Sequence, residues 1–253
     1  LHDPRIEEPG HREVMRATPW LLDELSCLDP AARATIRAHV GRIVRRMIFW
    51  VGESDAQGRI EVGGLRELDE YCYSVAGIVG EMITELFADA AGDLEPGRLG
   101  ALRALSADFG VGLQLTNILK DCRRDAREGR AWLPRGFRPE PGATDAEAYD
   151  RIAPVLSLAL ARLDRAVDYT CTLPTHHDGL RRFCLLPVLL AGATLVQLSS
   201  ESGALAAGQA LRIDRDRVAD LIELADVIVE HTGSIREVWT GLTAPLRATG
   251  ERW

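Results

Sequence analysis

Helix-forming sequence runs through nearly the whole chain and constrains its fold more than any other feature. Ala, Leu, Arg and Glu, which favour helices, dominate, whereas the apolar–polar alternation typical of strands is scarce. Proline- and glycine-rich segments divide the chain into predicted helices over about residues 30–50, 65–89, 99–128, 146–170, 180 onward and 216–232. The sequence therefore predicts an all-α fold in which residues 1–253 form a single helical bundle.

The charge and the cysteines restrict the partners and the compartment. The net charge of −8 argues against a nucleic-acid partner, which normally requires a basic face. The five cysteines form no C-x-x-C pair, so we expect free thiols in a reducing compartment. The longest apolar block, residues 183–198, contains a proline and is shorter than the roughly 18 apolar residues of a membrane span. We therefore expect a cytoplasmic protein without a transmembrane helix.

One predicted helical segment, residues 114–125 (QLTNILKDCRRD), carries a polar stripe beside an apolar one. At about 100° per residue, Gln114, Asn117, Asp121 and Asp125 fall within roughly 80° of one another, and Lys120 lies on the remaining side with two arginines. Asp121 and Asp125 stand one turn apart, about 6 Å along the axis. Two such carboxylates can hold Mg²⁺, which would clamp a diphosphate as a leaving group. The alternative is a solvated acidic pair balanced by neighbouring arginines.

Several segments in register resemble those of one enzyme family. QLTNILKDCRRDAREGRAWLP (residues 114–134) resembles the second aspartate-rich motif of squalene and phytoene synthases, and YCYSVAGIVGEMITELF (residues 71–87) resembles another helix of that family. LPTHHDGLRRFCLLPVLLAGATL and LRIDRDRV follow in the order seen in bacterial squalene-synthase-like members. The similarity spans about Trp20 to Trp239. It implies an isoprenoid-synthase bundle around a central cavity and a prenyltransferase that joins two prenyl diphosphates head to head.

The resemblance implies roles for residues of the polar stripe. Asp121 and Asp125 would bind Mg²⁺ and take part in catalysis, and Gln114 and Asn117 would line the same cavity. Arg130, an arginine that is always charged, would reach a diphosphate oxygen. Without the motif, Arg130 would be interpreted as a helix-end arginine near exposed carbonyl groups.

The second matched helix supplies the other expected site residues. Tyr71 matches the family tyrosine that steers the carbocation and its proton, since a phenol offers a π face to a cation and a hydroxyl to a proton. Val75 would be cavity wall. Tyr73, Gly77 and Gly80 share one face of the predicted helix, and we expect them to contact substrate. Small residues at this spacing admit either a prenyl chain or a neighbouring helix, which is the commoner case.

A basic cluster before the predicted last helix is the candidate cofactor site. In the family this cluster helps to bind the phosphates of NADPH, which implies the same role for Arg212 and Arg215. Asp214 lies between them, where relatives usually carry a polar or basic residue, and this departure weakens the transfer. Surface arginines are the alternative. No Gly-x-Gly-x-x-Gly motif follows a strand, so NADPH would bind by another route.

Together these expectations describe a Mg²⁺-dependent synthase. The leading hypothesis is condensation of two farnesyl diphosphates through presqualene diphosphate to squalene, with NADPH as reductant. The rivals are a phytoene or dehydrosqualene synthase that needs no reductant, and a non-catalytic protein that binds prenyl diphosphates. We expect a prenyl diphosphate as substrate and peripheral membrane contact, and the sequence points to no partner protein.

The family's first aspartate-rich motif has no counterpart here. Asp23, Glu24 and Asp29 are acidic but lack the Asp-x-x-x-Asp spacing, and the first residue is Leu1. Either the sequence starts inside a longer protein, which we expect, or the protein has lost half of its metal site.

Overall fold

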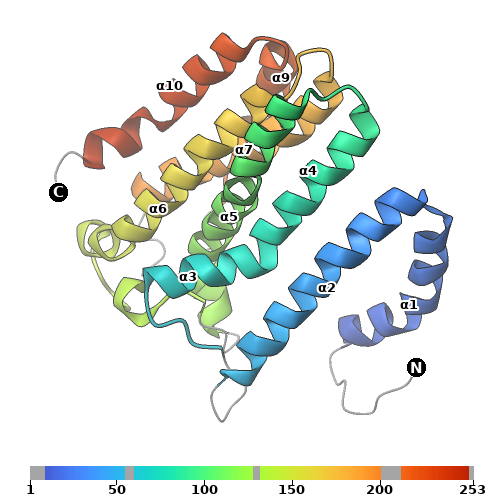
Figure 1. Ribbon diagram of the computed structural model, residues 1–253. Coiled ribbons are helices and arrows are strands. Elements are labelled where there is room, and N and C mark those ends of the chain that lie inside the picture. The colour runs from blue at the N-terminus through green and yellow to red at the C-terminus, as the bar shows by residue number, and fades with distance from the viewer. Residues whose placement is uncertain (1–8, 55–59, 128–131, 201–211, 251–253) are drawn as a thin grey trace.

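The computed structural model describes residues 9–54, 60–127, 132–200 and 212–250, which fold as helices joined by short connections. Their α-helices are α1 (Pro9–Cys27), α2 (Pro30–Gly52), α3 (Leu65–Cys72), α4 (Ile78–Ala91), α5 (Pro96–Arg127), α6 (Asp145–Thr172), α7 (Asp178–Ser200), α9 (Arg215–Ile228) and α10 (Thr232–Gly250) (Figure 1). A π-helical turn, η1 (Tyr73–Gly77), joins α3 to α4, and a 3₁₀ turn, η2 (Arg135–Phe137), precedes α6. The predicted all-α fold is confirmed.

Helix boundaries follow from local capping. Asp29 accepts a hydrogen bond from the backbone N–H of Ala31 at the start of α2, 2.8 Å away. Thr144 and Glu147 form a reciprocal capping box at the start of α6. Gly92 ends α4 with φ of 67°, a left-handed conformation that glycine adopts without steric cost.

The structure differs from the prediction at both ends of the chain. Helix α1 lies where no helix was predicted, and the single last helix predicted for residues 216–232 is wrong. Helix α9 ends at Ile228, and a separate α10 begins at Thr232. Both α1 and α10 contain a proline, Pro19 and Pro245, which removes a helical hydrogen bond and lowers the helix propensity of the segment.

Helix α5 lies at the centre of the bundle and contacts α3, η1, α4, α6 and α7 (Figure 1). Glycines bring it against η1 and α4 at backbone distance. A Cβ placed on Gly80 would lie 2.0 Å from the carbonyl oxygen of Ser106, and one on Gly110 would lie 2.0 Å from that of Ala76. These two positions therefore require glycine, because the contacting atoms are backbone and cannot rotate away.

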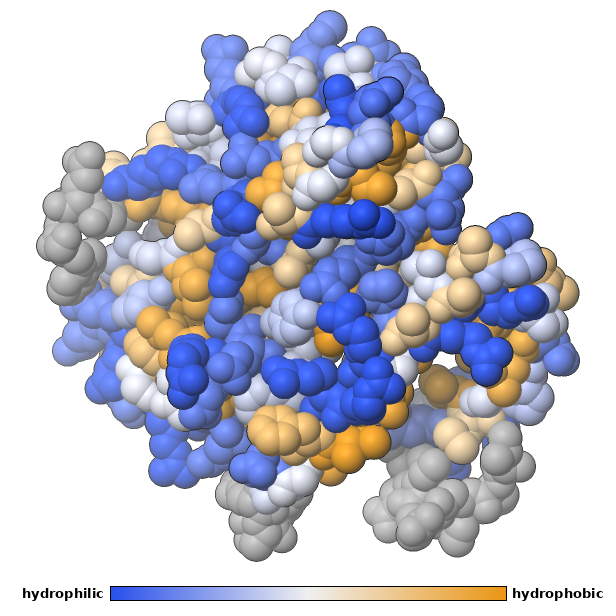
Figure 2. All heavy atoms as spheres, viewed as in Figure 1, coloured by the Kyte–Doolittle hydropathy of each residue, from blue (hydrophilic) through white to orange (hydrophobic). Residues whose placement is uncertain are grey.

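Helices α1 and α2 form the edge of the molecule, where α2 contacts α4 and η1 (Figure 1). Several large apolar side chains on α2, including Val44, Ile48 and Phe49, remain more than half exposed. A hollow of about 530 Å³ opens between α1 and α2, where Figure 2 shows a recess with hydrophobic atoms at its rim. An apolar outer surface of this kind is typical of a contact face.

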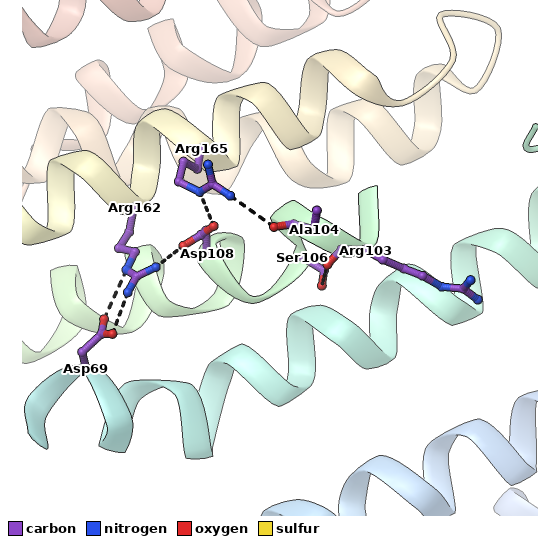
Figure 3. Close-up of polar contacts among 7 residues, drawn as sticks. All are labelled: Asp69, Arg103, Ala104, Ser106, Asp108, Arg162 and Arg165. Carbon is purple, nitrogen blue, oxygen red and sulfur yellow. Dashed lines mark hydrogen bonds and ion pairs between the residues drawn. The ribbon is translucent and has the colours of Figure 1, made fainter. Parts of the chain in front are cut away.

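An ion-pair network ties α3 to the centre of the bundle (Figure 3). Asp108 of α5, whose side chain is 7% exposed, accepts hydrogen bonds from Arg162 and Arg165 of α6. Arg162 also donates two hydrogen bonds to Asp69 of α3, at 2.6 and 3.2 Å. Asp69 lies two residues before Tyr71, so the network fixes the end of α3 that carries this tyrosine.

Helix α7 is long and apolar enough, by length and composition, to cross a membrane. In the bundle, 56% of its most apolar 18-residue window is buried against other helices, including α5, α6 and α10. A buried core helix of a bundle satisfies the same criterion.

Candidate active site

A polar pocket of about 470 Å³ opens between α5, α7 and the start of α9. The face of α5 that lines it carries Asn117, Lys120, Asp121 and Arg124, which recur at the three- and four-residue spacing of one helix side. Arg212 lines the pocket from the segment before α9. The pocket thus gathers one carboxylate and three cations.

Asp121 is held by its basic neighbours. One of its carboxylate oxygens lies 3.2 Å from Nη2 of Arg124 and 3.6 Å from Nζ of Lys120, and its side chain is 23% exposed. Lys120 also donates a hydrogen bond of 3.2 Å to the amide oxygen of Asn117. The prediction that Lys120 lies on the remaining side of the helix, outside the polar stripe, is wrong, because Lys120 follows Asn117 by three residues and lines the same pocket.

Asp125 and Tyr71 are both buried, and they are close enough for the charge of Asp125 to act on the Tyr71 phenol. Asp125 is buried with 8% exposure and does not line the polar pocket, although it follows Asp121 by one turn. Burial raises the pKa of Tyr71 far above its usual value, and the charges of Cys72 and Asp125 raise it further. The Tyr71 phenol is therefore neutral at physiological pH.

Two tryptophans enclose the Tyr71 ring. Trp132 stacks on it with centroids 4.8 Å apart and planes inclined by 14°, and Trp50 meets it edge to face at 5.5 Å. Trp50 in turn donates a hydrogen bond of 3.1 Å to the hydroxyl oxygen of Ser74. Neither tryptophan was predicted as a site residue, although Trp132 lies inside the quoted motif and could have been found there.

An apolar pocket of about 280 Å³ adjoins the polar one. Asn117 lines both pockets, as do Leu113 of α5 and Pro187 of α7. The apolar walls come from η1, α4, α5 and α7. They comprise Val75, Ala76, Val79, Gly80, Ile83, Phe109, Gly110 and Phe183, with Gln114 as a polar member. The structure therefore brings Val75, Gly80, Gln114 and Asn117 together around one pocket, and their roles in substrate binding stay predictions.

Tyr73 and Gly77 line neither pocket. The Tyr73 hydroxyl accepts a hydrogen bond from Arg42 of α2 at 2.8 Å and donates one to Glu81 at 3.0 Å, while Arg42 and Glu81 form an ion pair of 2.6 Å. A Cβ on Gly77 would lie 2.6 Å from the Tyr73 ring. Close packing, the alternative raised for the glycines, thus accounts for Gly77, and packing against α5 accounts for Gly80. The substrate-contacting roles of Tyr73 and Gly77 stay predictions.

The predicted cofactor arginines separate in the structure. Arg212 lines the polar pocket, whereas Arg215 is exposed at the first position of α9 and does not line that pocket. Asp214 between them is the N-cap of α9 and accepts a hydrogen bond of 2.7 Å from the N–H of Arg217. Helix capping therefore explains the acidic residue. Arg130 lies outside the described residues.

Comparison with known proteins identifies the family to which this chain is similar. The family model for squalene/phytoene synthase matches residues 11–218. A squalene synthase of Mycosarcoma maydis is 27% identical over 227 residues, which cover 75% of this chain and 39% of that protein. A 15-cis-phytoene synthase of Enterobacter agglomerans is 36% identical over 95 residues, 38% of this chain and 28% of that one. This chain thus spans about two fifths or less of each relative's length.

A solved structure of TcSQS in complex with the ligand BPH1237 shares the fold. Its TM-score is 0.68 at 19% sequence identity, over 88% of this chain and 71% of that one. A second complex of TcSQS, with another ligand, has a TM-score of 0.69 at 20% identity. Because the family model matches most of the chain, the chain belongs to the squalene/phytoene synthase family.

Proposed function

We propose that the protein is a Mg²⁺-dependent prenyltransferase that condenses two farnesyl diphosphates head to head, through presqualene diphosphate, to squalene. The observation that carries this proposal is the junction of the two pockets at Asn117. A prenyl diphosphate has an apolar chain joined to a trianionic head. The apolar pocket fits the chain, and the polar pocket fits the head.

The polar pocket suits a diphosphate with a divalent cation. Among the lining residues that the structure describes, Lys120, Arg124 and Arg212 carry three positive charges against the carboxylate of Asp121, an excess that favours an anion. Carboxylate and amide oxygens, here from Asp121 and Asn117, are ligands that Mg²⁺ accepts alongside substrate oxygens. When bound, Mg²⁺ neutralises charge that develops on the departing diphosphate. Asp125, one turn along α5, is the second proposed ligand.

The apolar pocket and Tyr71 serve the carbon chemistry. Loss of diphosphate from one substrate leaves an allylic cation, which the double bond of the second substrate attacks with loss of a proton to give the cyclopropyl diphosphate. Walls such as Val75 and Phe109 keep water from these cations. Tyr71 lines neither pocket and its ring stacks on Trp132, so its proposed part is through the hydroxyl of the neutral phenol, which can exchange the proton.

The second half-reaction consumes a hydride. Loss of the second diphosphate and rearrangement gives a cation, and NADPH, when bound, supplies the hydride that converts it to squalene. Arg212 is the better placed of the two proposed cofactor arginines, because it lines the polar pocket and Arg215 does not. We also propose a cytoplasmic location with peripheral membrane contact. The lipid nature of substrate and product and the exposed apolar residues of α1 and α2 support it.

The experiment incubates the protein from the intact gene with Mg²⁺ and either farnesyl or geranylgeranyl diphosphate, with and without NADPH. Squalene formed only from farnesyl diphosphate with NADPH, and lost in Asp121→Asn, is the expected result by mass spectrometry. Asp150→Asn, at an exposed position on α6, is the matched control and retains activity. A product formed without reductant would assign the phytoene or dehydrosqualene reaction. Binding without any product would leave only a prenyl-diphosphate-binding protein.

A further inference from the structure

Two connections of the bundle meet far from the proposed active site. The turn that follows α4 carries Asp93, and the turn between α6 and α7 carries His176 and His177. Asp93 lies just before α5, at the end of that helix opposite Asp121. The 25 residues from Pro96 to Asp121 correspond to roughly 37 Å at 1.5 Å per residue. Any ligand at this cluster is therefore separate from the polar pocket.

The three side chains converge on one point. Nε2 of His176 lies 2.7 Å from one carboxylate oxygen of Asp93, and Nε2 of His177 lies 2.7 Å from the other. One ligand atom from each residue lies within 4.8 Å of the other two. The imidazole centroids are only 4.4 Å apart, so two consecutive histidines direct the same ring nitrogen to a shared carboxylate.

The backbone on both sides holds this arrangement. Gly92 turns the chain after α4 through its left-handed conformation, which places Asp93 at the turn. The N–H of His177 donates to the carbonyl oxygen of Pro174 at 3.2 Å. The carbonyl oxygen of His177 accepts from the N–H of Leu180 at 3.1 Å, which fixes the start of α7. The ligands are thus preorganised, while 63% exposure of the His176 side chain leaves a path for an ion.

The donor set selects the kind of cation. Two imidazole nitrogens and a carboxylate suit Zn²⁺ and related transition-metal ions, whereas Mg²⁺ prefers oxygen ligands and retained water. Zinc bonds of about 2.0–2.2 Å place tetrahedral ligand atoms about 3.3 Å apart. Asp93 and His176 are exposed and His177 is half-buried, and small rotations of these side chains take the 2.7 Å contacts to that spacing. Water completes the fourth position.

We propose that Asp93, His176 and His177 form a zinc-binding site that links the α4–α5 turn to the α6–α7 turn. The ion replaces the two hydrogen bonds with three coordinate bonds. It stabilises the bundle because it binds the folded chain and not the unfolded one. The site does not depend on the proposed prenyltransferase activity.

The test titrates ZnCl₂ into the full-length, untagged protein after chelator treatment and dialysis, with calorimetry and thermal unfolding as readouts. We expect one Zn²⁺ per chain, an increase in Tm on zinc addition, and no displacement by millimolar Mg²⁺. The double variant His176→Gln/His177→Gln and the variant Asp93→Asn lose both effects. The zinc-free variants should show the circular dichroism of the wild type, because all three positions are on surface turns.

Two controls separate this site from other histidines and from the active site. His231→Gln, a histidine remote from the cluster in sequence and exposed, retains zinc binding, and so does Asp121→Asn. Cobalt(II) provides an independent measurement, because tetrahedral coordination gives strong visible absorption. We expect this absorption in the wild type and not in the variants of Asp93, His176 and His177. Absence of zinc binding in the wild type, or binding that survives both cluster variants, would overturn the proposal.

Discussion

Gly110→Ala should destabilise the bundle because no room exists for a methyl group. The added Cβ would lie 2.0 Å from the carbonyl oxygen of Ala76, 2.6 Å from its carbonyl carbon and 3.1 Å from the backbone nitrogen of Gly77. Heavy atoms attract at roughly 3.5–4.0 Å, so α5 and η1 must separate by more than 1 Å. Their backbone atoms cannot swing aside as a side-chain end could.

The magnitude follows from two opposing effects. Overpacking costs about 1–3 kcal/mol, and a backbone contact belongs at the upper end. Replacing glycine by alanine inside a helix returns about 1 kcal/mol of helix propensity. The free energy of unfolding should therefore fall by about 2 kcal/mol, which lowers Tm by about 4–8 °C in a domain of this size.

Gly100→Ala is the matched control on the same helix. A Cβ there meets nothing within 4 Å, so only the propensity gain applies, and Tm should rise by about 2–4 °C. Thermal and urea unfolding of both variants in one buffer measure the difference. If Gly110→Ala proves as stable as Gly100→Ala, the close contact between α5 and η1 does not exist and the argument fails.

Three further changes address the network, the phenol and the apolar pocket. Asp108→Asn should lower the unfolding free energy by about 1–3 kcal/mol in urea melts, because it leaves Arg162 and Arg165 facing a neutral amide. Unchanged stability would mean that these ion pairs contribute nothing net to the fold. The pKa of Tyr71 is raised in the folded state, so the free energy of unfolding of the wild type should fall as pH rises above about 10, and that of Tyr71→Phe should fall less. The same dependence on pH in both proteins would refute this. Val79→Phe fills part of the apolar pocket and should lower kcat/KM by about tenfold with little change in Tm. An unchanged kcat/KM would mean that the substrate does not bind in this pocket.

Much of the site could be predicted because its chemistry lies on one helix face. Gln114, Asn117 and Asp121 line the pockets at the spacing that the α5 stripe indicates. The stripe was drawn too narrowly, because Lys120 and Arg124 lie at three- and four-residue spacing from Asn117 and Asp121 and share their helix side. The helical angle alone could not show that Asp121 lines the polar pocket while Asp125 is buried near Tyr71. That difference depends on how the neighbouring helices cover each turn of α5.

The fold followed from sequence where helices have strong caps and breaks, as at Thr144 and Gly92. The sequence did not predict α10, which contains Pro245 and starts after a connection of only three residues from α9, because neighbouring helices stabilise what propensity opposes. The apolar pocket also depends on residues from separate segments, such as Phe109 and Phe183, which only tertiary packing brings together.

The π-helical turn η1 sets the rotational phase of the helix that surrounds it. Asp69 and Gly80 are eleven residues apart, and on an uninterrupted α-helix they would point within roughly 20° of each other. The extra residue held by the π-turn rotates one half against the other by about 100°. Asp69 can then meet Arg162 of α6 while Gly80 lies against Ser106 of α5. Winding the same residues as a regular α-helix would bring the two halves back into phase, and the helix would then lose one of these two neighbours.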